Sequence, residues 1–484
     1  MPKKTLLRNV ITGKELQDKI MAGVDKIEQV ASAAYGNSSG NVLIENRYGE
    51  PVVSHDGITN VANLVVADPV ENSAISIIRQ ASANTDTNAG DATTATIILA
   101  CAAYRHWAKV VSEGTPIRTA QQQMKDAVAY IVDKLHEGSI KSDDVTMDDL
   151  KNVATVSAGD EALGKAVAYA IESVGKNGGI TVIEQAKPQV DVDIINGFSF
   201  KSGLKAVALA SDLQTIKTTY DNPNVVVIPK PITKNDEILP ILDRLVRAGR
   251  KHIVLIADVS GQALETIVSN KLSGKLDIAV VEPPMTKRDQ FISDVAFYCN
   301  TKPYTDLPSN FDVDKHVGTV DSAYITMSET VLNGTHATGL DDYAKSIDDE
   351  DRRQMLLGRT ARIAVGASTQ AERQDTKLRV DDAVCATRTA QTGGIVYGGG
   401  VALKDIANDK LPYLDTPFFM LTNSDKAPGA GIGIDIMTGK TGNMRELGVM
   451  DSLTAIKEAV ENAHSAASQL LSIKVALPFS EDME

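Results

Sequence analysis

The sequence is poor in aromatic residues and in cysteine. Phe, Trp and Tyr together make up 4% of the 484 residues, with a single tryptophan. The core must therefore be built mainly from Ala, Val, Ile and Leu. The three cysteines, Cys101, Cys299 and Cys385, lie far apart in the chain. This usage excludes a disulfide scaffold and a cysteine-rich metal site, and it favours free thiols in a reducing compartment.

The sequence also lacks a membrane segment and an excess of basic residues. It contains no run of about 18 apolar residues, and its basic start lacks the apolar stretch of a signal peptide. Lys plus Arg total 49 and Asp plus Glu total 63, which gives a net charge of −14. Such a chain has no overall attraction to nucleic acid or anionic lipid. We therefore expect a cytoplasmic protein that binds neither nucleic acid nor a membrane.

The hydrophobic pattern divides the chain into helical outer parts and an α/β centre. With 43% hydrophobic residues the chain can bury a large core, and its length corresponds to roughly three domains. Apolar residues at helical spacing predict helices over 13–34, 70–87, 92–112, 115–137, 340–357 and 370–390. Between them, strands at 225–228, 253–257 and 278–282 alternate with helices at 235–248 and 261–272. This alternation predicts a parallel sheet covered on both faces, inserted into a helical domain formed by the two chain ends.

Two glycine-lysine segments approach the P-loop pattern without matching it. Gly159–Ala166 has the spacing but ends in Ala, so it lacks the hydroxyl that holds magnesium. Gly433–Thr441 ends in Gly-Lys-Thr but has one residue too many. We therefore predict no P-loop.

A better phosphate-binding candidate is Gly90-Asp-Ala-Thr-Thr94, where a long predicted helix begins. Free N–H groups and the helix dipole at such a position suit phosphate. Asp91 could hold the magnesium that accompanies a nucleotide. On spacing alone, an ordinary N-cap is the better explanation of the same residues. Ser54-His-Asp-Gly57, the Asp381-Asp382 pair and Gly398-Gly-Gly400 are similarly ambiguous, so no single motif decides the function.

Taken together, six segments resemble the chaperonin family, in its bacterial GroEL-type branch, in the family's order and over nearly the whole chain. They are Val53–Gly57, Asn88–Thr94, Val174–Val182, Arg379–Arg388, Tyr397–Leu403 and Gly442–Asp451. The resemblance implies a multi-domain fold of α and α/β type. A mostly helical equatorial ATP-binding domain would comprise 1–137 and 394–484, a small intermediate hinge domain 138–195 and 361–393, and an inserted α/β apical substrate-binding domain 196–360.

The resemblance also assigns roles to individual residues. It implies a Mg²⁺-dependent ATPase, with K⁺ as a further candidate ion, in which Asp91 holds the metal. Asp382 falls on the residue that orients the attacking water, and Asp56 on a second carboxylate near it. Contacts to the nucleotide would come from Gly36, Gly90, Asp91, Thr93, Thr94, Gly399, Ile436, Met437 and Asp451.

The same resemblance implies partners. Identical subunits would form seven-membered rings that enclose non-native polypeptides, bound by an apolar face made of Leu204, Leu239, Leu242, Leu264 and Val268. These leucines could instead pack on the sheet, as most leucines at helical spacing do. A lid co-chaperonin and the number of rings stay open.

The sequence departs from the family pattern at several places. The family's first phosphate loop, TLGPKGRN, reads Ala34-Tyr-Gly-Asn-Ser-Ser-Gly-Asn41, and the second glycine of GDGTTT is Ala92. The segment between Gly400 and Gly433 is shorter than in the family, and the C-terminus lacks the family's Gly-Met tail. Such divergence would suit a virus-encoded member, present in the cytoplasm of its host.

Two other functions remain as alternatives. The first is a passive ring or scaffold that binds exposed hydrophobic polypeptide without hydrolysing ATP, which the altered phosphate loop favours. The second is an unrelated α/β metabolic enzyme, which would need a catalytic histidine. The seven histidines show no motif pairing, and only His55 lies near a candidate site.

Overall fold

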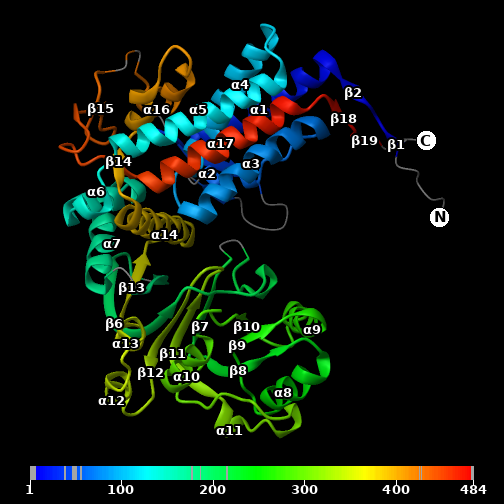
Figure 1. Cartoon of the computed structure of the whole chain (residues 1–484), viewed down its shortest axis with the longest axis vertical. Helices are drawn as coiled ribbons and strands as arrows, with labels where there is room; N and C mark the ends of the chain where they lie inside the picture. The colour runs from blue at the N-terminus through cyan, green and yellow to red at the C-terminus, as the bar shows by residue number, and fades with distance from the viewer. Residues whose placement is uncertain are drawn as a thin grey trace. The chain divides into compact units, whose positions relative to one another are not determined.

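The computed structural model describes most of the chain (Figure 1). The described residues are 7–36, 40–45, 52–54, 57–175, 178–185, 187–213, 216–424, 426 and 428–480. The predicted site residue Asp56 lies outside them. Contacts divide the chain into two compact units, unit 1 (Met1–Ala168, Glu184–Val190 and Val365–Glu484) and unit 2 (Tyr169–Ile183 and Asp191–Ala364). Both chain ends therefore belong to one unit, as predicted for a domain with an insertion.

Long helices form the core of unit 1 (Figure 1). They are α1 (Gly13–Ala33), α3 (Pro69–Ala89), α4 (Thr93–Ser112), α5 (Ile117–Gly138) and α17 (Leu453–Ser472). Helix α17 packs against α3, α4 and α5, and α1 packs against α3 and α4. Apolar residues at a spacing of three or four give α1 one buried face. The predicted helices in this part of the chain are confirmed.

Shorter elements complete unit 1. The helices are α2 (Gly57–Ala62), η1 (Ser142–Asp144), α6 (Met147–Ala158), α14 (Gln370–Gly393), α15 (Val401–Ile406), η4 (Pro412–Asp415) and α16 (Thr416–Thr422), and α7 (Glu161–Val174) begins here. The antiparallel strand pairs are β1 (Leu7–Arg8) with β19 (Phe479–Ser480), β2 (Ile11–Thr12) with β18 (Val475–Ala476), β3 (Val42–Ile44) with β4 (Val52–Ser54), β14 (Ile395–Tyr397) with β17 (Met450–Ser452), and β15 (Ile432–Ile434) with β16 (Thr441–Asn443).

Unit 2 is built on a mixed sheet with the strand order β10-β9-β8-β11-β12-β6-β13-β5, and β7 also pairs with β11. The strands are β5 (Ile180–Gln185), β6 (Val190–Phe200), β7 (Thr218–Asp221), β8 (Asn224–Ile232), β9 (Ile253–Val259), β10 (Ile278–Val281), β11 (Gly318–Ile325), β12 (Thr330–Thr335) and β13 (Arg359–Gly366). Strand β9 pairs parallel with both β8 and β10, whereas β8 pairs antiparallel with β11 on its other side. The predicted parallel arrangement is therefore confirmed for these three strands. Strands β11 and β12, which were not predicted from the sequence, pair antiparallel.

The helices of unit 2 are α8 (Asn235–Arg247), α9 (Gly261–Leu272), α10 (Arg288–Tyr298), α11 (Val313–His316), α12 (Leu340–Lys345) and α13 (Glu350–Leu357), with the short turns η2 (Val207–Leu209) and η3 (Pro308–Asn310). The single helix predicted over 340–357 is thus two helices. The break is explained by Asp349, whose side chain accepts from the Arg352 N–H and caps α13.

In the described part of the chain, no helix has a stretch of 18 residues apolar enough to span a bilayer.

Candidate functional site

The turn between α3 and α4 forms the centre of the candidate site. Gly90 ends α3 at φ 64°, and Ala92 precedes α4 at φ 63°. Asp91 stands between these two left-handed residues, and its carboxylate accepts from the Ala92 N–H at 2.5 Å. Helix α4 then begins at Thr93, so its free N–H groups lie beside Asp91. Thr94 faces Gly57 so closely that a Cβ on Gly57 would lie 2.0 Å from Thr94 Oγ1.

Asp451 comes to this turn from a distant part of the chain. It lies on β17, paired with Val396 of β14, and its carboxylate accepts from the Gly399 N–H. Gly399 has φ 62°, and a Cβ on Gly398 would lie 3.0 Å from Asp451 Oδ1. The glycines after β14 therefore allow the backbone to approach this carboxylate closely.

The carboxylates of Asp91 and Asp451 lie close enough to affect each other. Removal from water raises the pKa of Asp451 to about 7, and the negative charge of Asp91 adds to this effect. Removal from water also raises the pKa of Asp91. Two carboxylates held together in this way favour a bound cation, and hard divalent cations take carboxylate oxygens. The residues present therefore fit a magnesium–nucleotide site.

The loop after α1 also reaches this cluster. Gly36 has φ 85° and packs so tightly on α16 that a Cβ would lie 2.5 Å from the Leu421 carbonyl oxygen. The preceding residue, Tyr35, has its pKa raised by burial and by the charges of Asp451 and Asp91. The structure thus brings Gly36, Gly90, Asp91, Thr93, Thr94, Gly399 and Asp451 into one region of unit 1.

Asp382 lies on α14, the helix that contacts the α3–α4 turn. A Cβ on Gly90 would lie 2.3 Å from the Cys385 Cβ, so these two residues touch. Asp382 precedes Cys385 by three residues and therefore shares its helix face. Its side chain is half-buried. The predicted water-orienting residue is thus carried by the helix that packs on the predicted metal-binding turn.

Two further predicted nucleotide contacts lie on a hairpin turn. Ile436 and Met437 lie on the turn between β15 and β16. The Asp435 carboxylate closes this turn by accepting from the Met437 N–H and the Thr438 hydroxyl. Met437 is 76% exposed, and Ile436 is half-buried.

Two residues near the site were not predicted from the sequence. Tyr35 stands in the altered phosphate loop, directly before Gly36. Its position next to this glycine is the only signal in the sequence that could have indicated it. Ser157, at the end of α6, has a buried hydroxyl with no hydrogen-bond partner in the described part of the chain. It is nevertheless near enough to lower the pKa of Asp91. No motif marks Ser157, because its helix comes from a segment without any nucleotide-binding pattern.

The predicted apolar face of unit 2 requires a correction. Leu204 and Leu242 are only 3% and 5% exposed and belong to the hydrophobic core. The prediction of an exposed position is therefore wrong for both, because the sheet and its covering helices enclose them. Leu264 and Val268 are half-buried against the same core. Only Leu239, on α8, is well exposed, at 44%.

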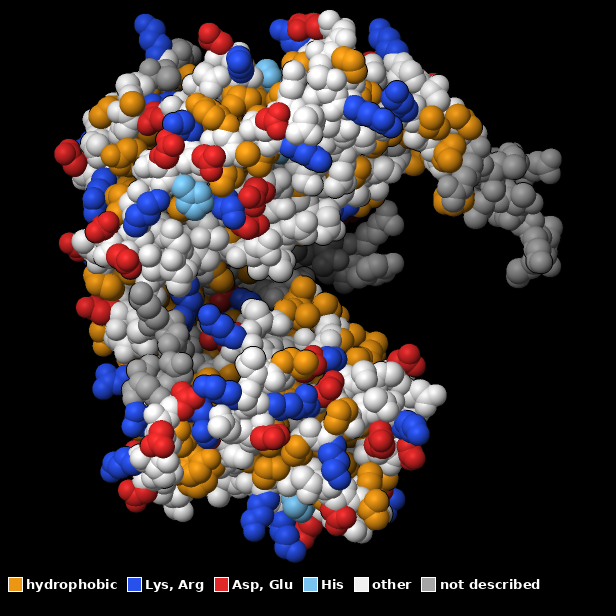
Figure 2. Space-filling view, in the orientation of Figure 1, with side chains coloured by type: hydrophobic (Ala, Val, Ile, Leu, Met, Phe, Trp, Pro, Cys, Tyr) orange, Lys and Arg blue, Asp and Glu red, His pale blue; other side chains and the backbone are white. Residues whose placement is uncertain are grey.

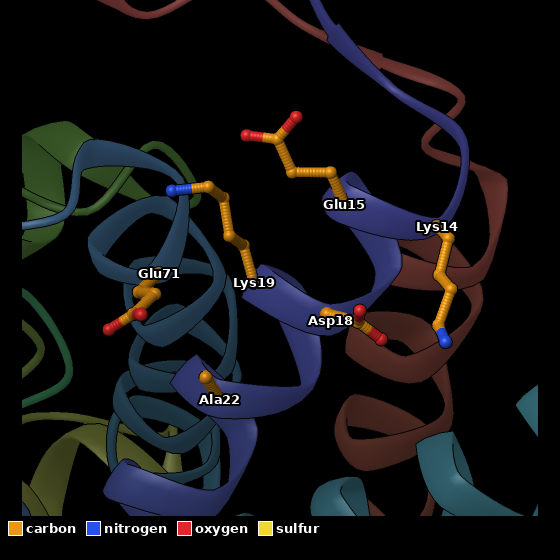
Figure 3. Close-up of a pocket in the computed structure, with 6 residues that line it drawn as sticks. All are labelled: Lys14, Glu15, Asp18, Lys19, Ala22 and Glu71. Carbon is orange, nitrogen blue, oxygen red and sulfur yellow. The ribbon is translucent and has the colours of Figure 1, made fainter.

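An open pocket of about 510 Å³ lies on the surface formed by α1 and α3 (Figure 3), and no predicted site residue lines it. Lys19 lines it and pairs with Asp68, while Glu71 pairs with Lys26. Because the charges are paired, the pocket does not concentrate one sign of charge. On the face shown in Figure 2, acidic and basic side chains are likewise interspersed.

Comparison with known proteins agrees with this geometry. The model of the TCP-1/cpn60 chaperonin family matches residues 27–409. The chain therefore belongs to the TCP-1/cpn60 chaperonin family.

The solved structures similar to this chain include two crystal forms of the chaperonin gp146 from the bacteriophage EL 2 (Pseudomonas aeruginosa), both in the presence of ATP-BeFx. Crystal form II is 20% identical, with a TM-score of 0.68 over 98% of this chain and 99% of that chain. Crystal form I is also 20% identical, with a TM-score of 0.64 over 97% and 99%. The fold of the chain is thus the chaperonin fold.

Proposed function

We propose that this chain is an ATP-dependent chaperonin whose subunits form a ring that binds and encloses non-native protein and assists its folding. The observation that carries the proposal is the meeting of Asp91 and Asp451, about 360 residues apart in the sequence, at the turn that α14 covers. The likeness to a phage chaperonin solved with ATP-BeFx supports nucleotide binding and a virus-encoded source. The host cytoplasm would then be its location.

Each part of the site has a task in this proposal. Mg²⁺, held by Asp91, would neutralise charge on the nucleotide phosphates. The N–H groups at the start of α4 and the Thr93 and Thr94 hydroxyls would bind the phosphate oxygens. Asp382 would accept a hydrogen bond from the attacking water and orient it. Since Asp382 stands on α14 of the proposed hinge domain, movement of that helix would couple hydrolysis to the shape of the subunit.

Exposed apolar residues support assembly into a ring. On the β3–β4 hairpin, Leu43 is 70% exposed and Val53 is 52% exposed. The short terminal strand pairs expose Val10, Val475 and Phe479 by 67%, 50% and 57%. Edge strands with exposed apolar side chains pair readily with strands of another chain. The seven-membered ring itself is carried over from the family resemblance.

The surface proposed to bind client protein must be smaller than the sequence suggested. It would be centred on Leu239 and the half-buried Leu264 and Val268. Val246, seven residues after Leu239 on α8, is 52% exposed and extends this face. An exposed apolar face of this kind would hold polypeptides that expose hydrophobic residues.

A passive scaffold remains the second candidate. Its supporting observation is the loop 34–41, which has lost the basic residues of the family pattern. Such a ring would hold non-native protein without turning over ATP.

A measurement of ATP hydrolysis with Mg²⁺ by the purified large particle distinguishes the ATP-dependent chaperonin from the passive scaffold. We expect turnover by the natural sequence and about a hundredfold or greater loss in Asp382→Ala, since positioned proton-transfer groups contribute about 10²–10⁴-fold. Asp375→Ala, on the same helix, is the matched control and should keep its activity. A large particle without turnover would support the passive scaffold instead.

A further inference from the structure

Helix α6 is attached to the candidate site by a bidentate ion pair. Arg445 donates from Nε to Asp149 Oδ1 at 3.1 Å and from its NH2 group to Oδ2 at 2.8 Å. Asp149 is only 3% exposed. It also accepts from the Thr146 N–H at 3.0 Å and from its hydroxyl at 2.8 Å. These donors hold the pKa of Asp149 below its usual value. The carboxylate is therefore ionised and fixed at neutral pH.

Arg445 belongs to a compact turn that leads directly into β17. Asn443 caps the turn by accepting from the Arg445 N–H at 3.0 Å, and the Val449 N–H donates to the Met444 carbonyl at 2.8 Å. The turn ends at Val449, whose carbonyl accepts from the Gly398 N–H at 3.0 Å. Asp451 follows two residues later. A shift of this turn would therefore be transmitted to Asp451 through β17.

A second contact from the same helix face supports the turn. Asn152 follows Asp149 by three residues on α6. A Cβ on Gly448, which has φ 74°, would lie 3.1 Å from Asn152 Oδ1. The other end of α6 brings Ser157 near Asp91. One helix thus contacts both segments that carry the carboxylates of the site.

We infer that Asp149 and Arg445 are positioning residues, which hold the 443–451 segment so that the Asp451 carboxylate meets the ribose of a bound nucleotide. The inference rests on the proposed function and on the family resemblance, by which Asp451 falls on the ribose and adenine side of the nucleotide. Neither side chain would touch the nucleotide. Their effect should be confined to nucleotide affinity and to recognition of the ribose hydroxyls.

The test compares the affinities for ATP and 2′-deoxy-ATP, measured with Mg²⁺ by titration calorimetry on the full-length protein. The natural sequence should bind ATP more tightly than 2′-deoxy-ATP. In Arg445→Met, we expect ATP to bind about tenfold more weakly, since a charged hydrogen-bonded pair is lost. The preference for ATP should fall to within about twofold. Arg445→Lys, which keeps the charge but not the two parallel hydrogen bonds, should be intermediate.

Arg352→Met is the matched control. Arg352 also makes a bidentate pair with a buried carboxylate, Asp294 in unit 2, at 2.8 Å for both bonds. Its loss should leave both affinities unchanged. Asp149→Asn, which keeps an acceptor for Thr146, replaces Arg445→Met if that variant does not fold.

Three results would overturn the inference. They are an unchanged ATP affinity in Arg445→Met, an equal loss for both nucleotides, and a natural sequence that does not distinguish them. A natural sequence that binds neither nucleotide would instead contradict the proposed function itself.

Discussion

At the scale of single residues, Ala92 is a site of local backbone strain beside the candidate site. It adopts φ 63°, a left-handed conformation that costs a residue with a Cβ about 1–2 kcal/mol. Glycine loses about 0.5–1 kcal/mol more conformational entropy on folding than alanine. Ala92→Gly should therefore raise the free energy of unfolding of unit 1 by about 0.5–1 kcal/mol, measured by chemical denaturation. Ala22→Gly, within helix α1, is the control and should lower that free energy by about 1 kcal/mol.

His464 should make the stability of unit 1 dependent on pH. It is buried on α17, where Nε2 lies 2.7 Å from the Tyr413 hydroxyl and Nδ1 2.7 Å from the Val460 carbonyl. Burial lowers its pKa from 6.5 to about 4. The unfolded chain therefore binds more protons than the folded protein between these values. The stability should fall by about 3 kcal/mol as the pH drops from 6.5 to 4.

The measurement is the free energy of unfolding against pH in the natural sequence and in His464→Gln. In His464→Gln, the free energy of unfolding should no longer show the fall that His464 causes between pH 6.5 and 4. The exposed His136→Gln is the control and should keep it. A slope that stays the same in His464→Gln would contradict the assignment.

The sequence could predict the residues of the site only through their motifs. Asp91 and Asp451 each stand in a segment with a recognisable pattern. Their proximity depends on the packing of α14 and β17, which no local pattern encodes. Leu204 and Leu242 show a second limit of the sequence. An apolar pattern predicts an apolar face, but it does not show whether other elements cover that face. Arg445 and Ser157 carry no motif, so only the folded chain could show their contacts.

At the scale of elements, the ammonium group of Lys404 on α15 holds residues 428–432, in the shortened segment that follows this helix, by hydrogen bonds. The residue is only 7% exposed. Nζ donates to the carbonyls of Pro428, Gly429 and Ile432 at 3.0, 3.1 and 3.3 Å. It also lies 2.8 Å from the Asp405 carboxylate. These acceptors offset the free-energy cost of removing the Lys404 ammonium charge from water.

Lys404→Met should leave these acceptors without their donor. Removing one partner of a buried pair typically costs about 3–5 kcal/mol, so we expect faster amide hydrogen exchange across 428–434. The exposed Lys410→Met is the control. Unchanged protection of 428–434 in Lys404→Met would show that other contacts hold the segment.

The sequence predicted long helices better than short strands. For the long helices α3, α4 and α14, the predicted bounds lie within a few residues of the observed ones. Strands β11 and β12 contain Gly, Asn and Asp, which have low strand propensity. Their pairing depends on neighbours distant in the chain. The antiparallel half of the sheet was therefore missed.

At the scale of the whole molecule, the inserted arrangement of the chain could be predicted, because the helical and α/β patterns change along the sequence. The ring is predicted only through the family resemblance, since it would depend on surfaces that a second subunit covers. The double variant Leu43→Asp and Val53→Asp places charge on the exposed β3–β4 hairpin. We expect it to convert the large particle to single subunits, as followed by light scattering. Leu307→Asp, at a residue 65% exposed in unit 2, should leave the particle intact.

The central claim is that this chain uses ATP to assist folding. The most direct test is the yield of active enzyme recovered when a chemically denatured client is diluted into the sized particle, with and without Mg²⁺–ATP. We predict that the natural sequence captures the client and releases it active only with ATP. Asp382→Ala should capture the client but fail to complete repeated cycles. Equal recovery with and without ATP would contradict the claim and leave a passive scaffold.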